Sequence, residues 1–530
     1  MFFLLYRSGL SLTHIQNIFL SFSLKKAILP KINNLEMTNL KYRRQFLFSP
    51  IECKKLEGWQ TEKVDNYFIY VHPDCKFEKS SGVNDLYLIG YFCDPHHETR
   101  SSQDILNNLS QLNNINDFPN KLYSLVGRFV LIIKTENDFI FFNDPCGFKT
   151  IYYTKDNDKF FAASQPLLIK EVVDLKQTRF YDDYFNSNYV AENIENWVPS
   201  GFTFYKNTYH LIPNHYIKIS EPIQVRYYPF KEIELINYSE LVIKFSNLLK
   251  KIVLAAHRNM DLTFTLTAGW DTRIILSCCK DYIDGMTFYT LKYRGMNAAH
   301  PDIKIPMLLS RTLKLNFDIY NCQKEITPEF SDVYKSNTDM AHIDDWGKIA
   351  FGMSKSYPDK KVAVKGVCSE VGRCFYYPNG KVNYTITIND LLNLESGWVE
   401  LGFLQEEIRK WYLSLEKNCY NYNLYDLFYW EHRMGSWQAQ SQLEWDIVQE
   451  VFTPFNSREI IDLMFSIEAS KREKYHPQLY LDAIKYLWKE TLRQPINPID
   501  NKTKIKNTVI KILKKIGLLQ GLKSIMKKIS

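Results

Sequence analysis

A strand, a short polar turn and a helix are predicted within residues 262–279 (LTFTLTAGWDTRIILSCC), and this stretch constrains the fold more than any other. Residues 262–266 combine apolar side chains with two threonines, which is typical of a buried strand. From Arg273 onward the spacing of Ile, Leu and Cys suits a helix packed on a sheet. The turn between them presents backbone amides at a helix N-terminus and two threonine hydroxyls, so it can hold an anion such as pyrophosphate. Asp271 fits this turn if Mg²⁺ stands between its carboxylate and a phosphate.

The turn resembles the pyrophosphate loop of asparagine synthetase-type enzymes, S-G-G-x-D-S, with threonine for both serines and Ala268 for the first glycine. Alanine has less backbone freedom than the family's glycine at that point. A plain turn between a strand and a helix is the alternative. The resemblance implies an ATP-binding site formed by Thr267, Ala268, Gly269, Trp270, Asp271, Thr272 and Arg273.

A second stretch that resembles the same family follows a predicted strand at residues 361–364. Residues 365–376 (KGVCSEVGRCFY) can be laid without gaps on the family's S-G-E-G-S-D-E-x-x-G-G-Y loop. Glycine, serine and the final tyrosine match, and Glu370 replaces the aspartate that in the family shares Mg²⁺-pyrophosphate with the first loop. The resemblance therefore implies that Gly366 and Ser369 contact the nucleotide.

Two carboxylates, Asp271 and Glu370, are expected to hold Mg²⁺ and to act in catalysis. Brought together from separate strand ends, they would supply oxygen ligands that a Mg²⁺-triphosphate needs. The alternative is that Glu370 is a surface acid paired with Arg373. The family also uses a late lysine to neutralise charge on the triphosphate. Lys502 and Lys504 are the candidates in about the matching region.

One position in the second loop departs from the family in a way that affects the reaction. Val367 stands where the family's synthetases carry a glutamate implicated in amide formation, and valine cannot move a proton. Either the nucleophile differs from ammonia, or another group serves, or the second half-reaction is lost. Downstream, residues 450–457 resemble the family's E-A-R-V-P-F-L-D, but Phe452 and Ser457 replace its arginine and its aspartate. His432 is expected to be a helix surface or core residue rather than a catalyst.

The region from about residue 44 to residue 225 is rich in Tyr, Phe, Ile and Val, with turn signals between its apolar runs. This pattern suggests an antiparallel sandwich. The predicted short strands cover residues 86–90, 127–134, 139–142, 151–154 and 160–164.

Two stretches in this region resemble the amidotransferase half of asparagine synthetase. Residues 127–130 (GRFV) match its G-x-F-A strand with valine for alanine, and residues 143–153 lie on its R-D-x-x-G-x-(K/R)-P-L-Y-Y turn. An ordinary hairpin with a glycine turn is the alternative. The family's glutaminase uses a cysteine at its first position, whose free α-amine serves as the base. No cysteine follows Met1 or Met37 here, and Cys53 lies well inside the chain, so we expect that this half does not hydrolyse glutamine.

Four segments are predicted from these patterns. They are an uncertain N-terminal extension (1–36), an amidotransferase-like domain without its nucleophile (37–225), an ATP-pyrophosphatase synthetase domain (226–505) and a basic amphipathic tail (506–530). The tail suits either a terminal helix docked on the body or a peripheral contact with an anionic membrane surface.

Charge and cysteine usage narrow the class of protein. The net charge is +7, but residues 502–530 hold nine lysines and no acid, so no basic surface for nucleic acid is indicated elsewhere. The ten cysteines include no C-x-x-C pair, which indicates reduced thiols in a cytosolic protein. We expect a cytoplasmic protein whose tail could reach the inner face of the membrane.

The expected fold is α/β plus α+β. An N-terminal antiparallel β-sandwich would precede a parallel-sheet domain of the adenine nucleotide α-hydrolase type, with a helical C-terminal part. The resemblance implies an ATP-dependent ligase that activates a carboxylate as an acyl-adenylate, releases pyrophosphate and forms an amide with an amine. Two alternatives stay open: a non-catalytic binding or scaffold protein, and a peptide or β-lactam-type cyclase.

Overall fold

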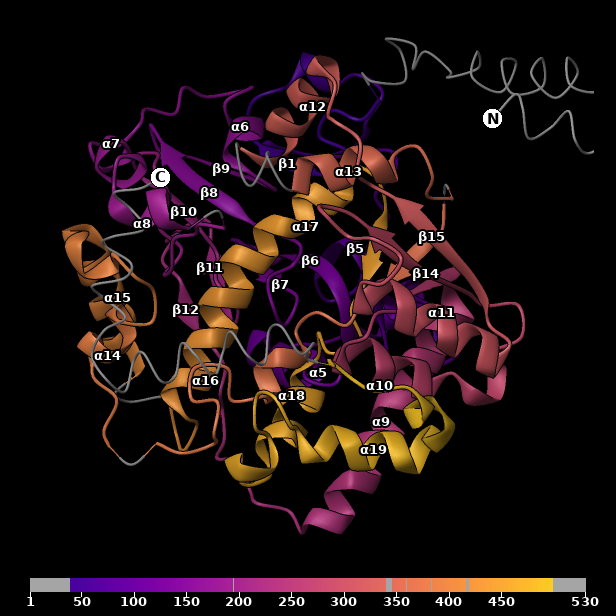
Figure 1. Ribbon diagram of the computed structural model, residues 1–530. Helices are drawn as coiled ribbons and strands as arrows, with labels where there is room; N and C mark the ends of the chain where they lie inside the picture. The colour runs from indigo at the N-terminus through magenta and orange to yellow at the C-terminus, as the bar shows by residue number, and fades with distance from the viewer. Residues whose placement is uncertain are drawn as a thin grey trace, which may run out of the picture.

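The computed structural model describes residues 39–193, 195–339, 346–358, 360–382, 384–415 and 419–498 (Figure 1). The predicted extension at residues 1–36, the candidate lysines Lys502 and Lys504, and the predicted tail at residues 506–530 lie outside these ranges. Within them, no helix is both long enough and apolar enough to cross a membrane.

Two six-stranded antiparallel sheets form the N-terminal half. The two sheets pack face to face. The ring centroid of Phe48 in one sheet lies 5.3 Å from that of Phe139 and 5.1 Å from that of Phe141 in the other. The predicted sandwich is therefore present. In spatial order, one sheet contains β10 (Thr208–His210), β8 (Tyr152–Asp156), β9 (Lys159–Ala163), β1 (Phe46–Ser49), β3 (Tyr67–Val71) and β2 (Gln60–Val64). The other contains β12 (Val225–Arg226), β11 (His215–Lys218), β7 (Phe139–Asn143), β6 (Val126–Lys134), β5 (Asp85–Cys93) and β4 (Phe77–Ser80).

Five short helices flank the sandwich. They are α4 (Ser102–Leu109), α5 (Phe118–Leu122), α6 (Pro166–Ile169), α7 (Phe180–Phe185) and α8 (Asn188–Glu192). The first begins with a capping box, in which Ser101 and Asp104 satisfy each other's backbone amides. On the opposite side of this half, α7 and α8 extend toward the helices of the C-terminal half (Figure 1).

The C-terminal half contains a five-stranded sheet in which all pairings are parallel, as the alternation of strands and helices predicts. Its spatial order is β15 (Asn316–Asn321), β14 (Thr287–Lys292), β13 (Leu262–Thr265), β16 (Val362–Val364) and β17 (Glu450–Phe452). From β13 the chain adds β14 and β15 on one side of the sheet, and it then adds β16 and β17 on the other side of β13. The strand order therefore reverses between β13 and β16. Ligands in open sheets of this kind bind outside the carboxyl ends of the strands at such a switch point. Both loops that resemble the asparagine synthetase family begin there.

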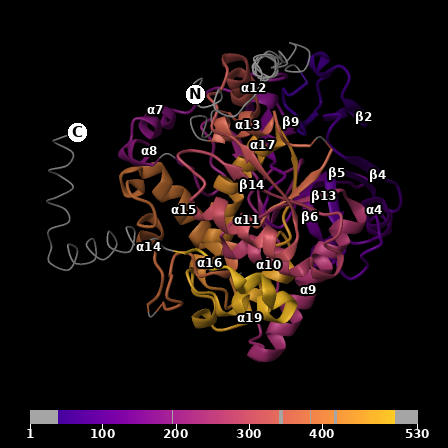
Figure 2. The same cartoon turned by 45° about the vertical axis from the view of Figure 1, so that its right-hand side comes forward.

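Helices cover both faces of this sheet (Figure 2). Phe264 and Phe288 point to the face that packs on α9 (Tyr238–Asn259), α10 (Trp270–Cys278) and α19 (Gln478–Trp488). Tyr289 and Ala363 point to the opposite face, which packs on α12 (Pro328–Thr338), α13 (Lys348–Met353) and α17 (Ala439–Asp446). The remaining helices include α11 (Pro301–Leu313), α14 (Ile388–Leu392), α15 (Gly402–Leu415), α16 (Leu424–Phe428), the π-helix η8 (Tyr429–Gln438) and α18 (Arg458–Phe465).

Helix α11 contains Pro306, and a proline at such a position typically kinks a helix or delays its start. The start is not delayed, because the helix begins at Pro301. A proline leaves the carbonyl four residues before it without its helical partner. Here that carbonyl belongs to Asp302, and the hydroxyl of Thr290 donates to it at 3.1 Å. The sheet therefore replaces the hydrogen bond that Pro306 removes and fixes Asp302 beside β14.

Candidate active site

A cavity of about 220 Å³ lies at the carboxyl ends of β13, β14 and β16. We call it the loop cavity. Five of the residues predicted from the sequence line it: Thr267, Asp271, Thr272, Gly366 and Glu370. The two loops that are 94 residues or more apart in the chain thus meet at one place, because parallel strands bring their carboxyl ends to the same edge of the sheet.

The first loop is held in shape by its own threonine side chains. The hydroxyl of Thr272 accepts the amide of Thr267 at 3.0 Å, and the hydroxyl of Thr267 accepts the amide of Gly269 at 3.1 Å. The two hydroxyls lie 3.1 Å apart. These two loop amides are therefore engaged inside the loop. The amides of the first turn of α10, which starts at Trp270, have no partner within that helix and are the donors available to an anion.

Asp302 is a third carboxylate in the loop cavity and was not predicted as a site residue. It accepts the amide of Ala268 at 2.9 Å, so it fixes the first loop from the start of α11. The sequence shows only an acid in the first turn of a helix, which is an ordinary feature. Its contact with residue 268 depends on how α11 docks, and that is not visible in the local pattern.

Asp271 and Glu370 converge on a single cation. One guanidinium nitrogen of Arg373 lies 3.0 Å from a carboxylate oxygen of Asp271 and 3.2 Å from one of Glu370. Ser369 also donates a hydrogen bond to Asp271, and its own carbonyl accepts the hydroxyl of Tyr480 at 2.7 Å. Glu370 is thus paired with Arg373, as in the alternative interpretation, but it is partly buried and faces the cavity rather than the open surface.

The pKa of Glu370 reflects this crowding. Burial and the neighbouring charge of Asp271 raise it to about 7, against the opposing effect of Arg373. The negative charges of Asp271 and Glu370 in turn raise the pKa of Arg373, in spite of its burial. When Glu370 is ionised, the two carboxylates carry more negative charge than one arginine neutralises, which favours a further cation.

Gly366 permits the close approach of the two loops. A Cβ atom at this position would lie 2.5 Å from the Cβ of Asp271 and 3.0 Å from its carbonyl carbon. No side chain fits in that space without moving the first loop away from the second. The glycine that matches the family's loop thus has a steric role in this chain.

The donor set fits Mg²⁺ only as a partial shell. Within the described ranges, no group of three or more His, Cys, Asp or Glu side chains is placed to hold a metal ion. Asp271 and Glu370 would provide two oxygen ligands, and Mg²⁺ typically takes one or two carboxylates together with phosphates and waters. The arrangement suits a metal that arrives with a triphosphate.

Lys365 is a second residue of the loop cavity that sequence reasoning missed. It is buried, and its ammonium nitrogen lies 2.8 Å from the centroid of the Trp445 ring. Burial lowers the pKa of Lys365 well below its usual value. A lysine at the end of a predicted strand suggests a solvated charge, and its burial under Trp445 becomes visible only in the folded structure.

Five predicted residues do not line the loop cavity: Ala268, Gly269, Trp270, Arg273 and Ser369. The fully buried Arg273 shows why. Its guanidinium donates to the carbonyls of Thr491 and Gln494, each at 2.8 Å, so it points toward the C-terminal segment instead of the loop. Successive helix residues differ in direction by about 100°, which separates Arg273 from the cavity-facing Thr272.

Two further predicted residues lie where the sequence suggests. Val367 lines the loop cavity and brings no titratable group to it. His432 is completely buried between the rings of Trp411 and Phe428, and its Nδ1 accepts the amide of Ser200 at 3.1 Å. Burial lowers the pKa of His432 to about 3, so it is a neutral core residue.

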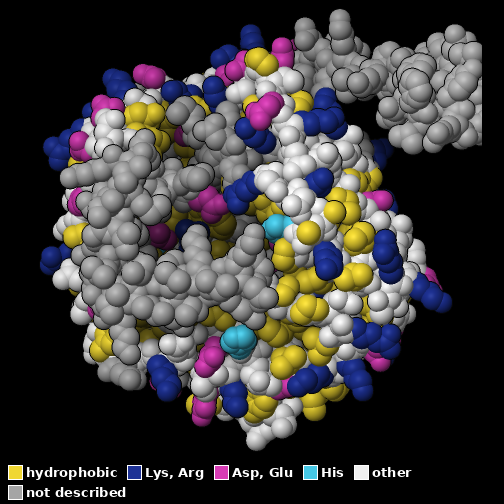
Figure 3. All heavy atoms as spheres, in the orientation of Figure 1, with side chains coloured by type: hydrophobic (Ala, Val, Ile, Leu, Met, Phe, Trp, Pro, Cys, Tyr) yellow, Lys and Arg dark blue, Asp and Glu magenta, His cyan; other side chains and the backbone are white. Residues whose placement is uncertain are grey.

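Arg128, within the first family-like stretch of the N-terminal half, and Cys53 are both buried. Arg128 makes two hydrogen bonds, of 2.5 Å and 2.6 Å, to the carboxylate of Asp446, and both groups lie in the interior between the two halves. Cys53 is buried, and burial raises the pKa of its thiol. All ten cysteines are free, and nine are buried within the protein. Lys and Arg side chains are scattered over the visible face rather than gathered in one patch (Figure 3).

No protein-family model matches this chain, and no curated protein matches its sequence. Solved structures that are similar over part of the chain include glutamine phosphoribosylpyrophosphate amidotransferase from B. subtilis, in complex with ADP and GMP. It is 10% identical over 54% of this chain and 61% of that chain, with a TM-score of 0.21. This chain thus spans less than two thirds of its length.

Two synthetases are similar over a smaller part of this chain. NMN synthetase from Francisella tularensis is 12% identical over 32% of this chain and 73% of that chain, with a TM-score of 0.19. The NH3-dependent NAD synthetase from Campylobacter jejuni, in complex with nitrate, is 12% identical over 33% and 78%, with a TM-score of 0.17. At such scores the likeness supports no argument, so fold and function rest on the chain's own residues.

Proposed function

We propose that this protein is an ATP-dependent ligase of the asparagine synthetase type, with a synthetase domain of the adenine nucleotide α-hydrolase type and an amidotransferase-like sandwich that does not hydrolyse glutamine. One observation carries the proposal. The two loops that resemble the family's nucleotide loops meet at the switch point of a parallel sheet, with Asp271 and Glu370 facing one cavity. The proposed substrates are Mg·ATP, a carboxylate and an amine.

In the proposed reaction a carboxylate oxygen attacks the α-phosphorus of ATP, the bond to the bridging oxygen breaks, and pyrophosphate leaves. The hydroxyls of Thr267 and Thr272 and the first-turn amides of α10 would hold the leaving pyrophosphate. Asp271 and Glu370 would hold Mg²⁺, which screens the charge of the phosphates when it is bound. Lys365 adds a cation at the cavity wall, because a bound anion favours its protonated form.

The acyl-adenylate would then react with an amine to give an amide and AMP. Val367 offers no proton acceptor for this step, which favours an amine other than ammonia or a base supplied by the substrates. Asp302 has a positioning role in the proposal, since it holds the amide of Ala268 and thereby the first loop.

A binding or scaffold protein is the second candidate, and two observations favour it. Two loop amides are engaged by threonine hydroxyls, and Arg373 bridges the two carboxylates where a metal would bind. A protein that had lost turnover could keep this closed arrangement. A cyclase would share the adenylation step, and the loop cavity alone does not separate it from other amide-forming ligases.

The proposal is tested by following AMP and pyrophosphate release from Mg·ATP with a panel of carboxylates, using hydroxylamine to trap acyl-adenylates. We expect equimolar AMP and pyrophosphate with at least one carboxylate, and a loss of about 100-fold or more in Asp271→Asn. Mg·ATP binding without AMP formation from any carboxylate would favour the scaffold.

A further inference from the structure

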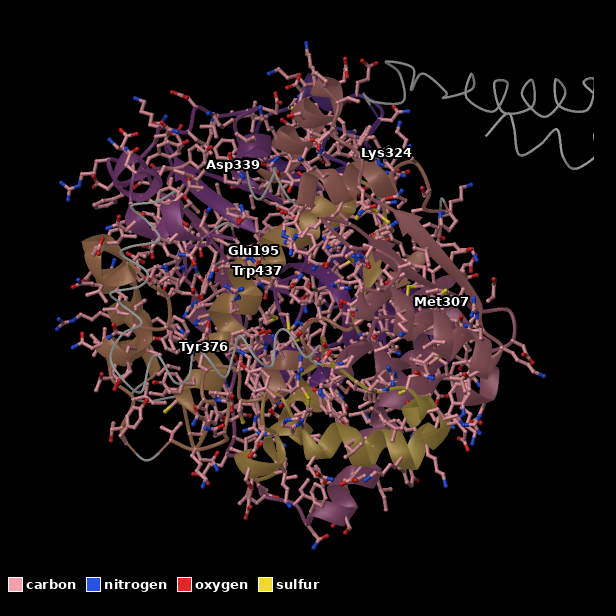
Figure 4. All side chains as sticks on the ribbon, viewed as in Figure 1. Glu195, Met307, Lys324, Asp339, Tyr376 and Trp437 are labelled. Atoms are coloured by element: carbon pink, nitrogen blue, oxygen red, sulfur yellow. The ribbon has the colours of Figure 1, made fainter. Side chains whose placement is uncertain are left out.

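A second cavity, of about 390 Å³, lies between the sandwich and the helices of the C-terminal half. We call it the aromatic cavity. The sandwich half contributes most of its walls, chiefly the rings of Tyr152, Tyr181, Tyr184, Phe202, Phe204 and Tyr205. Asp339 at the end of α12, Ser436 of η8 and the start of α17 close the other side. It shares no lining residue with the loop cavity. Figure 4 labels Asp339 beneath α12, on the side of β8 and α7.

Asp339 is the acidic group of the aromatic cavity. Its carboxylate accepts the hydroxyl of Tyr205 at 3.1 Å. Burial raises the pKa of Asp339 to about 6, against the effects of Tyr205 and of Lys170. At neutral pH the side chain is therefore a carboxylate held in surroundings that solvate it poorly. A cation inside the cavity would stabilise it.

Two residues that line the same cavity each carry a buried polar atom without a partner. The Nε2 atom of His210 and the hydroxyl of Ser436 are buried, and neither has a hydrogen-bond partner among the described residues. His210 is 3% exposed and stacks on Tyr152, with ring centroids 4.5 Å apart. Burial lowers its pKa to about 3, so the imidazole is neutral and, in one tautomer, its Nε2 accepts a hydrogen bond. Buried polar groups without partners are costly, so a donor that reached them would stabilise them.

The chemistry of these groups selects the ligand. An ammonium group has three N–H donors, and Asp339, His210 and Ser436 are three acceptors. The faces of aromatic rings attract cations in addition. Lys335 also lines the cavity, but it is exposed, so an anionic ligand inside would still meet the carboxylate of Asp339 in poorly solvated surroundings. The aromatic walls suit an apolar body, and the volume falls in the range of small-molecule sites.

We propose that the aromatic cavity binds a primary ammonium group carried on an apolar or aromatic body, with Asp339 as counter-ion and His210 and Ser436 as further acceptors. An amide-forming ligase needs an amine, so such a ligand is compatible with the proposed function. The proposal stands on the residues of the aromatic cavity alone and requires no nucleotide in the loop cavity.

The test is calorimetric titration of the full chain, without nucleotide, with benzylammonium. Benzyl alcohol serves as the neutral probe of similar shape and phenylacetate as the anionic one. Benzylammonium should bind at least about tenfold more tightly than either, since an ion pair and charged hydrogen bonds are lost with the other two. Asp339→Asn keeps an acceptor for Tyr205 and should weaken benzylammonium by about tenfold or more. Asp332→Asn, on an exposed aspartate of the same helix, should change nothing.

Equal binding of benzyl alcohol and benzylammonium would overturn the proposal, and so would an unchanged affinity in Asp339→Asn. Absence of binding by benzylammonium would overturn it as well. Should Asp339→Asn fail to fold, the ranking of the three probes on the unaltered protein decides. Loss of Mg·ATP binding leaves these outcomes untouched, so a failure of the proposed function and a failure of this proposal are distinguishable.

Discussion

In the N-terminal half the charged residue of a family-like stretch is buried against the rest of the protein, whereas in the C-terminal half two such residues face a cavity. Arg128 is 3% exposed, and its guanidinium donates to the carboxylates of Asp446 and Glu450 and to the carbonyl of Phe148. Asp271 and Glu370, by contrast, share a single arginine, and Glu370 has a raised pKa. Both sets of residues come from stretches that resemble the same family. A buried charge whose hydrogen-bond and ion-pair partners are all supplied by the protein stabilises the fold. Where they are incomplete and face a cavity, it is available to a ligand.

The largest expected effect is on stability and concerns Arg128. Arg128→Met leaves Asp446 buried without its bidentate partner, which should lower the free energy of unfolding by about 3–5 kcal/mol. Chemical denaturation measures it. Lys79→Met is the matched control, because Lys79 pairs with Glu62 at the surface, and an exposed pair contributes about 1 kcal/mol or less. Equal stability of the two variants would mean that the buried pair is not structural.

Next in size is the effect of closing the space between the two loops. Gly366→Ala places a Cβ 2.5 Å from that of Asp271, so the loops must separate. We expect Mg·ATP affinity to fall by about tenfold or more, in line with a cost of roughly 1–3 kcal/mol for overpacking. Gly402→Ala, where an added Cβ meets nothing within 4 Å, should bind as the unaltered protein does. Unchanged affinity in Gly366→Ala would show that the two loops do not act together.

The two loops show how much of the fold and of the site the sequence predicts. The strands at residues 262–266 and 361–364 were predictable because their apolar patterns are local, and the strand ends then place Asp271 and Glu370 at one edge. Asp302 and Lys365 were missed, because their roles depend on how α11 and Trp445 pack from elsewhere in the chain.

Arg273 shows the opposite error. It was predicted from its place beside the turn, but the helix rotates its side chain toward Thr491 and Gln494. The internal hydrogen bonds of the threonine loop were equally invisible, since they depend on side-chain direction. Position in a motif thus predicts where the backbone lies better than where a side chain points.

A smaller effect should follow from the pKa of Glu370, which is about 7 because burial and Asp271 raise it. A proton on this carboxylate competes with Mg²⁺, so the Mg²⁺ concentration needed for half-maximal ATP binding should fall as pH rises toward about 7. Below about pH 7 the required Mg²⁺ concentration should fall by up to about tenfold per pH unit, and above about pH 7 it should become constant. Glu370→Gln, whose side chain cannot take up a proton, is the control and should not show this dependence on pH. A flat profile would mean that Glu370 does not bind the metal.

The smallest effect concerns Lys365, whose pKa is lowered by burial. A bound triphosphate should raise that pKa, so binding takes up a proton and affinity falls as pH rises through the interval between the free and bound values. Calorimetry in buffers of different ionisation enthalpy measures this uptake. Lys365→Met should abolish the proton uptake. Lys361→Met is the control and should leave the uptake unchanged, because Lys361 lies at the other end of the same strand and pairs with Asp261. Equal uptake in both variants would assign the proton elsewhere.

The most direct test of the central claim is calorimetric binding of Mg·ATP to the purified protein and to Asp271→Ala. The account predicts binding that requires Mg²⁺ and is lost in the variant, while the variant's unfolding temperature stays close to that of the unaltered protein. Unchanged binding in Asp271→Ala, or no binding by either protein, would contradict the assignment of the loop cavity as a nucleotide site.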